Sequence, residues 1–205
     1  MPILPGEYKY TTHTQYSNDS IRMASDFSIR HAAHIIKHGG IIAYPTDTVY
    51  GLGCDPYNPD AVEKINLIKQ RPLNKQFILL AGHINQLRAL IQVSKQQEKV
   101  ITQNTEPTSW VVKSSPKAPS WLVDRNNTLT IRISRHENIQ DLCQALGHAI
   151  ISTSANISGK TPAKSSLELH KYFFHKVDKI LLSNKKPTAK ASRIIRLCDN
   201  HVIRE

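Results

Sequence analysis

The sequence predicts an α/β domain with a mixed parallel and antiparallel sheet and flanking helices. Short apolar segments alternate with amphipathic segments along the chain, which is the pattern of strands that alternate with helices. Several short apolar segments lie close together near the C-terminus, and this spacing favours a mixed sheet over a purely parallel one. Hydrophobic residues make up 40% of the chain, which is enough for a real core and argues against disorder.

The elements follow from apolar periodicity and from start and stop residues. We expect the polar residues 1–25 to form an N-terminal arm and residues 26–205 to form one domain. Asn58 followed by Pro59 marks the start of a helix that ends near Lys69, and Gly147 closes a later one. The expected helices are residues 26–38, 59–69, 84–91, 95–102, 138–146 and 165–174. The expected strands are residues 41–44, 77–81, 110–112, 129–133, 148–151, 179–182, 193–197 and 202–204.

Composition restricts the class of protein. No apolar run is long enough to span a membrane, and the N-terminus lacks the pattern of a signal peptide. The three cysteines are far apart and outside any metal motif, so they indicate free thiols in a reducing cytoplasm. The net charge is +11, and residues 160–205 carry eleven basic against four acidic residues. Such a surface attracts anions such as RNA or nucleotides, or it simply keeps the protein soluble.

Three segments carry groups suited to holding an anion. Residues 45–51 place hydroxyls, a carboxylate and a glycine after the strand over 41–44, at a sheet edge where ligands bind in α/β proteins. Residues 69–75 place Lys69, Arg71 and Lys75 around the end of a helix, and three such cations repel one another unless an anion bridges them. Residues 152–156 place three hydroxyls and an amide directly after a buried strand.

Each segment also has an ordinary structural interpretation. The first can be a capped turn, the second a solvated helix end whose cations complement the helix dipole, and the third a polar loop. No Walker A loop, nucleophile elbow or acidic pair is present, and we predict no protein metal site. Groups that hold anions outnumber groups that transfer protons, which suits phosphoryl or adenylyl transfer.

Taken in this order, the segments resemble the YrdC/TsaC family, whose members make threonylcarbamoyl-AMP for the t6A modification of tRNA. The matching residues are 44–56, 69–75, 128–133 and 152–159. The resemblance implies a twisted sheet around a basic central cavity. It also implies a nucleotidyltransferase that converts L-threonine, bicarbonate and ATP, with Mg²⁺, into threonylcarbamoyl-AMP and pyrophosphate. Downstream tRNA threonylcarbamoyl-transfer proteins would be partners, a contact with tRNA or other RNA stays open, and no membrane is expected.

The resemblance also implies roles for individual residues. Lys69 and Arg71 would be catalytic by offsetting charge on the leaving group. Threonine would contact the residues at three positions, which are Thr48, Arg132 and Ser192. ATP would contact the residues at seven positions, which are Arg71, Lys75, Thr128, Ser152, Ser154, Asn156 and Arg204.

Two departures from the family pattern leave alternatives open. Glu106 stands where the family has a glycine, and Arg193 follows Ser192 where threonine or glutamate is common. An inactive paralogue is therefore one alternative hypothesis. A non-catalytic RNA-binding module, using the basic cavity and the C-terminal face, is the other.

Overall fold

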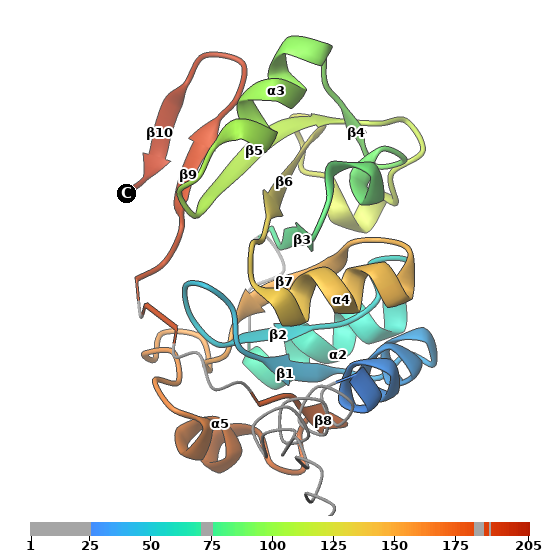
Figure 1. Ribbon diagram of the computed structural model, residues 1–205, viewed down its shortest axis with the longest axis vertical. Coiled ribbons are helices and arrows are strands. Elements are labelled where there is room, and N and C mark those ends of the chain that lie inside the picture. Colours follow the sequence, from blue (N-terminus) through green and yellow to red (C-terminus); the bar gives the residue numbers. More distant parts are fainter. Residues whose placement is uncertain (1–25, 71–75, 183–186, 189) are drawn as a thin grey trace, which may run out of the picture.

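The structure is a computed structural model that describes residues 26–70, 76–182, 187–188 and 190–205. Within them, one continuous sheet runs through the molecule, with strand order β10-β9-β5-β6-β3-β7-β2-β1-β8 and with β4 beside β5 (Figure 1). The strands are β1 (Ile42–Tyr44), β2 (Gly51–Gly53), β3 (Ile78–Ala81), β4 (Ile91–Gln92), β5 (Thr108–Ser114), β6 (Thr128–Ile133), β7 (Ile150–Ser154), β8 (Lys179–Ile180), β9 (Arg193–Arg196) and β10 (His201–Arg204).

The predicted mixed sheet is confirmed. β1 pairs with β8, β3 with β6, and β5 with β9 in parallel, whereas the other pairs are antiparallel. Neighbouring strands therefore often come from distant parts of the sequence. This topology brings the ends of β1, β6 and β7 and the C-terminal hairpin β9–β10 toward one region.

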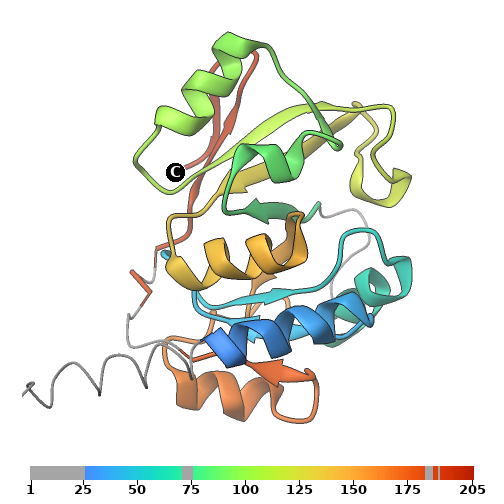
Figure 2. The same cartoon turned by 45° about the vertical axis from the view of Figure 1, so that its right-hand side comes forward.

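The helices are a helix over residues 26–37, α2 (Pro59–Lys69), α3 (Lys95–Gln103), α4 (Glu137–Leu146) and α5 (Ser166–Phe173). α3 lies at the top of the molecule beside β5, and the other helices surround the lower part of the sheet (Figure 1). Figures 1 and 2 both show α4 beside the helix over residues 26–37 on one side of the sheet. Side chains alternate along a strand, so Leu80 packs with these two helices while Leu79 packs with α2 on the opposite face.

The amphipathic helices form where the sequence predicts them. In α2, Ala61, Val62 and Ile65 are buried, and the Asn58 side chain accepts a hydrogen bond from the Ala61 amide at 3.1 Å. The helix ends at Gln70, whose left-handed φ of 51° lets its amide reach back to carbonyls of the last turn. Lys69 is thereby fixed at the C-terminal end of α2.

Two predicted elements need correction. The segment over residues 84–91 is a short 3₁₀ helix, Ile84–Leu87, followed by strand β4 rather than an α-helix. The reason is a local capping box, in which His83 and Gln86 close a single turn. The sequence also gave no sign of β2, which turns residues 42–53 into a β-hairpin. β7 is longer than expected, because Ser152–Ser154 continue the strand.

No helix in the described part of the chain is long and apolar enough to cross a membrane. The predicted arm over residues 1–25 lies outside the described residues, so the proposed domain boundary remains a prediction.

The cap of α2 gives a stability prediction. Asn58→Ala removes the acceptor for the Ala61 amide, so we expect the free energy of unfolding to fall by about 1 kcal/mol. Urea denaturation followed by circular dichroism measures this loss. Asn58→Asp is the matched control, because it keeps an acceptor and complements the helix dipole. Equal destabilisation by both variants would contradict this account of the cap.

Candidate functional site

The candidate site is a cavity of about 580 Å³ on the sheet, under the C-terminal hairpin. Its walls come from the β1–β2 loop, from β3, β5, β6 and β7, and from the segment that leads into β9 and β10. Six residues that the sequence analysis assigned to the site line this one cavity, namely Thr48, Arg132, Ser152, Ser154, Ser192 and Arg204. Residues as distant in sequence as Thr48 and Arg204 therefore meet in one place.

Thr46 organises the β1–β2 loop. Its hydroxyl donates to the Val49 carbonyl at 2.7 Å and accepts from the amides of Thr48 and Val49 at 3.1 and 3.2 Å. The Thr46 and Thr48 hydroxyls lie 3.0 Å apart, and either can be the donor in this contact. Both side chains are buried, and the turn presents the Thr48 oxygen to the cavity.

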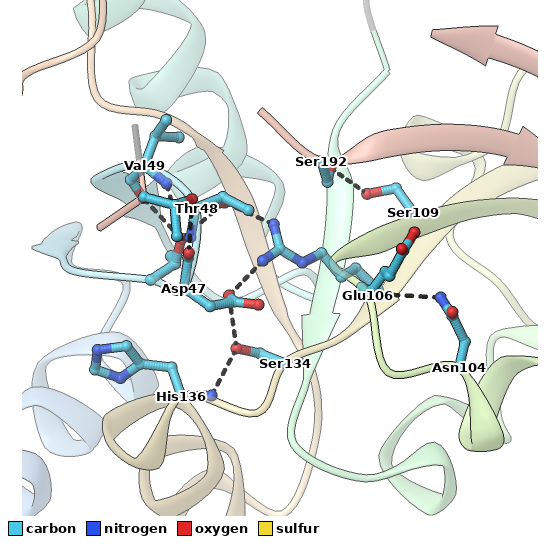
Figure 3. A network of polar contacts seen from close by, with 12 residues as sticks. Asp47, Thr48, Val49, Asn104, Glu106, Ser109, Ser134, His136 and Ser192 are labelled. Carbon is cyan, nitrogen blue, oxygen red and sulfur yellow. Dashed lines mark hydrogen bonds and ion pairs between the residues drawn. The ribbon is translucent and has the colours of Figure 1, made fainter. Parts of the chain in front are cut away.

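Arg132 joins this loop to β6. Its Nη1 donates to the Thr48 hydroxyl at 2.8 Å, and its Nη2 forms an ion pair with Asp47. Ser134 Oγ donates to the same Asp47 carboxylate at 3.3 Å and accepts from the His136 amide at 3.2 Å (Figure 3). Arg132 is 5% exposed, so its charge is buried and balanced by Asp47.

The C-terminal hairpin supplies the second guanidinium. Arg204 donates through Nε and Nη2 to the Ser192 carbonyl at 3.2 and 2.7 Å, and the Ser192 hydroxyl lies 2.9 Å from that of Ser109 (Figure 3). Burial lowers the pKa of Arg204, and the positive charge of Arg132 lowers it further. In the described part of the chain, no acidic side chain forms an ion pair with Arg204. The cavity therefore favours an anion.

Lys69 orders the loop after β7. Its ammonium donates to the carbonyl oxygens of Ser154 and Asn156 and to the Asn156 side-chain oxygen, the last two at 2.8 and 3.1 Å. Ser154 Oγ donates to the same side-chain oxygen at 2.6 Å. Lys69 is 2% exposed and does not line the cavity, so in this structure it supports the wall that carries Ser154.

The structure does not bring every predicted site residue into the cavity. Thr128 is absent from the lining, and its hydroxyl donates to Asp124 at 3.0 Å. Thr130, two residues along the same strand, lines the cavity together with Arg132, and the sequence analysis did not select it. The roles assigned to these residues stay predictions.

Two further predicted residues, Arg71 and Lys75, lie outside the described residues. Asn156 does not line the cavity. Its side-chain oxygen accepts from Lys69 and from Ser154, and of these two residues Ser154 lines the cavity. Asp47 lies in the segment 45–51 that the sequence analysis selected, but no role was assigned to it there.

Glu106, which the sequence analysis noted as a departure from the family pattern, does not line the cavity. Its side chain is 67% exposed and lies 3.6 Å from Arg193, which also pairs with Glu205 at 3.1 Å. The register of β5 against β9 explains the pairing, because Thr108 is opposite Arg193. The two departures noted in the sequence thus contact each other on the surface.

No group of three or more His, Cys, Asp or Glu side chains that could hold a metal ion occurs among the residues that the structure describes. The Asp47 carboxylate, a possible metal ligand beside the cavity, forms an ion pair with Arg132. The described residues of the cavity therefore do not fit a protein-held metal ion.

Comparison with known proteins places this geometry in a family. The family model Sua5_yciO_yrdC, described as "Telomere recombination", matches residues 34–205. Threonylcarbamoyl-AMP synthase of Hydrogenovibrio crunogenus is 41% identical over 140 residues, covering 66% of this chain and 75% of that protein. The protein of the same name from Methylobacillus flagellatus is 36% identical and covers 83% and 96%.

Two solved structures support the same assignment. Sua5 of P. abyssi complexed with L-threonine has a TM-score of 0.78 and 28% identity, covering 85% of this chain. This chain spans about half the length of that protein, at 52%. E. coli YciO also has a TM-score of 0.78, with 27% identity and coverage of 88% and 89%. The twisted α/β fold around a cavity, the site segments and these matches together show that the chain belongs to the Sua5/YrdC family.

Proposed function

We propose that this protein is a nucleotidyltransferase that makes L-threonylcarbamoyl-AMP from L-threonine, bicarbonate and ATP, for the t6A modification of tRNA. The main observation in support of this proposal is that two guanidinium groups and several hydroxyls line one cavity in a member of this family. The name shared by its relatives, threonylcarbamoyl-AMP synthase, and the L-threonine complex of P. abyssi Sua5 support the proposal.

We assign threonine to the part of the cavity formed by Thr48, Arg132 and Ser192. The amino acid carries a carboxylate, which the Arg132 guanidinium suits, and a hydroxyl and an amine, which are donors. The Thr48 hydroxyl accepts from Arg132 and lines the cavity, so it is placed to form a hydrogen bond with the substrate. The substrate hydroxyl would then bind to Thr48, and the substrate carboxylate would bind to the adjacent Arg132.

We assign ATP to the remaining lining of the same cavity, with Ser152 and Ser154 facing the nucleotide and Arg204 facing the phosphates. The threonine amine first takes up the carbon of bicarbonate and releases water, giving an N-carboxylate. An oxygen of that carboxylate then attacks the α-phosphorus, the bond to the β-phosphate oxygen breaks, and pyrophosphate leaves with the electron pair. Fixed cations stabilise the charge that develops on the leaving group.

The roles of the other basic residues, of Mg²⁺ and of the downstream proteins are proposed from the sequence. Lys69 orders the wall, while Arg71 and Lys75 would face the triphosphate. Mg²⁺, where it takes part, would enter with ATP and be held by its phosphates. The product is a reactive mixed anhydride, so tRNA threonylcarbamoyl-transfer proteins would consume it directly. The three free cysteines suit a reducing cytoplasm.

Substrate omission tests the reaction class. We expect pyrophosphate release only when threonine, bicarbonate and ATP are all present, because the nucleophile is the N-carboxylate and not threonine itself. A coupled pyrophosphate assay with each substrate left out in turn measures this. RNA binding with a steep salt dependence and no turnover would instead favour the RNA-binding module.

Arg204 provides a test of charge stabilisation. Arg204→Ala removes a desolvated guanidinium from the cavity, so we expect kcat for pyrophosphate release to fall about 100-fold, as for a lost oxyanion donor. Steady-state kinetics with saturating threonine measures the loss. Arg196→Ala is the control, because Arg196 lies on β9, does not line the cavity and pairs with Asp199 on the surface. A similar kcat for both variants would refute the role of Arg204.

Glu106 tests whether the chain is an inactive paralogue. Its side chain is exposed and outside the cavity, and a surface ion pair contributes little, so we expect Glu106→Gly to change kcat/KM by less than about threefold. The same pyrophosphate assay applies, with Glu205→Gln as a control that weakens the other partner of Arg193. An inactive natural protein that gains activity from Glu106→Gly would support the paralogue hypothesis.

A further inference from the structure

Asp47 is held from several sides at the cavity wall. Its carboxylate accepts from Arg132 Nη2 and from Ser134 Oγ, and its backbone carbonyl accepts from Thr188 Oγ1 at 3.1 Å. Ser134 is fully buried and is itself fixed by the His136 amide. Asp47 itself does not line the cavity, so its effect on a ligand must pass through a neighbour.

That neighbour is Arg132, which does line the cavity. A guanidinium has five N–H donors, and the structure engages one terminal nitrogen with Thr48 and the other with Asp47. The Nε atom is buried and has no hydrogen-bond partner among the residues that the structure describes. A buried donor without a hydrogen bond is energetically costly, so a ligand that accepts from this Nε–H would gain affinity. Asp47 and Thr48 meanwhile hold the guanidinium in place through its two terminal nitrogens.

The second guanidinium makes this support necessary. Arg204 lines the same cavity, and the charge of Arg132 is one of the causes of its lowered pKa. Two cations that share a desolvated cavity repel each other. Asp47 offsets one of them and pulls Arg132 toward the β1–β2 loop, which keeps the two guanidinium groups at their separate positions.

We propose that Asp47 is a positioning residue that sets the Arg132 guanidinium for recognition of the carboxylate of the amino-acid substrate. This inference rests on the proposed function. Asp47 acts by its oxygen atoms, which accept from Arg132 and Ser134, and it does not touch the substrate. Recognition of the amino acid therefore depends on Asp47, whereas recognition of ATP does not, because Asp47 contacts Arg132 and Ser134 but none of Ser152, Ser154 and Arg204.

The experiment measures the KM for L-threonine and for ATP separately. We expect Asp47→Ala to raise the KM for threonine by about tenfold and to leave the KM for ATP within about twofold. Asp47→Asn keeps an acceptor oxygen but removes the negative charge, so we expect a threonine KM between those of the natural protein and Asp47→Ala. In an Arg132→Lys background, Asp47→Ala should add little, because the group that it orients is gone. Asp199→Ala is the matched control, since it breaks the surface pair with Arg196.

A spectroscopic measurement reports the geometry directly. In proton–nitrogen correlation spectra of arginine-labelled protein, the Nε–H signal of Arg132 is assigned by its loss in Arg132→Lys. We expect L-threonine to shift it in the natural protein and in Asp47→Asn, and L-threoninamide, which lacks the carboxylate, to leave it in place. If Asp47→Ala does not fold, Ser134→Ala replaces it, with a smaller rise in the threonine KM alone.

The outcomes separate this inference from the proposed function. An unchanged threonine KM in Asp47→Ala, or an equal rise in both KM values, overturns the positioning role while a working natural enzyme keeps the function. A full effect of Asp47→Ala in the Arg132→Lys background also overturns it. A natural protein that neither releases pyrophosphate nor responds to threonine overturns both.

Discussion

The site depends on the buried contact of Arg132 with Asp47 and Thr48. Arg132 lies on β6, whereas Asp47 and Thr48 lie in the loop after β1, and three strands separate β6 from β1 in the sheet. Adjacent strands lie ~4.8 Å apart, so the two strand axes are about 19 Å from each other along a flat sheet. The loop must fold back across the twisted sheet to meet Arg132, and this crossing creates one wall of the cavity.

The same contact determines the electrostatics of the cavity. Removing a guanidinium from water is unfavourable unless an opposite charge and hydrogen bonds replace the water, and Asp47 and Thr48 provide both for Arg132. Among the described residues, Arg204 is hydrogen-bonded to the carbonyl and hydroxyl of Ser192 and to no carboxylate. A ligand anion is therefore attracted mainly by Arg204, while Arg132 offers directional donors at little net charge. One cavity can in this way hold a polyphosphate beside a small zwitterion.

The sequence predicted those parts of the fold that local patterns determine. The helices with 3.6-residue stripes and clear caps, such as α2 and α4, lie where they were expected. β2 was missed because Gly51–Gly53 has no strand-forming side chains. Its glycines are required by packing, since a Cβ on Gly53 would lie 2.6 Å from the Ile151 carbonyl and 2.8 Å from the Tyr44 ring. Such contacts between distant segments leave no local trace in the sequence.

The candidate site shows the same division. Along β6, Leu129 and Ile131 point into the core while Thr130 and Arg132 line the cavity, as alternation along a strand requires, but this alternation does not say where along the strand the cavity lies. Thr128 and Thr130 are equivalent by pattern, and only the neighbouring strands and Asp124 distinguish them. Asp47 was likewise indistinguishable from a turn residue until its long-range partner was placed.

The register of the sheet also changes the meaning of the two departures from the family pattern. Glu106 alone suggests a negative charge near an anion-binding cavity, which would weaken binding. β5 and β9 run in parallel with Thr108 opposite Arg193, so the Glu106 carboxylate lies 3.6 Å from the Arg193 guanidinium. An exposed pair of this kind contributes less than about 1 kcal/mol, so it adds little to the stability of the fold. Because Glu106 does not line the cavity and its charge is paired with Arg193, it gives no direct reason to expect a weaker anion-binding cavity.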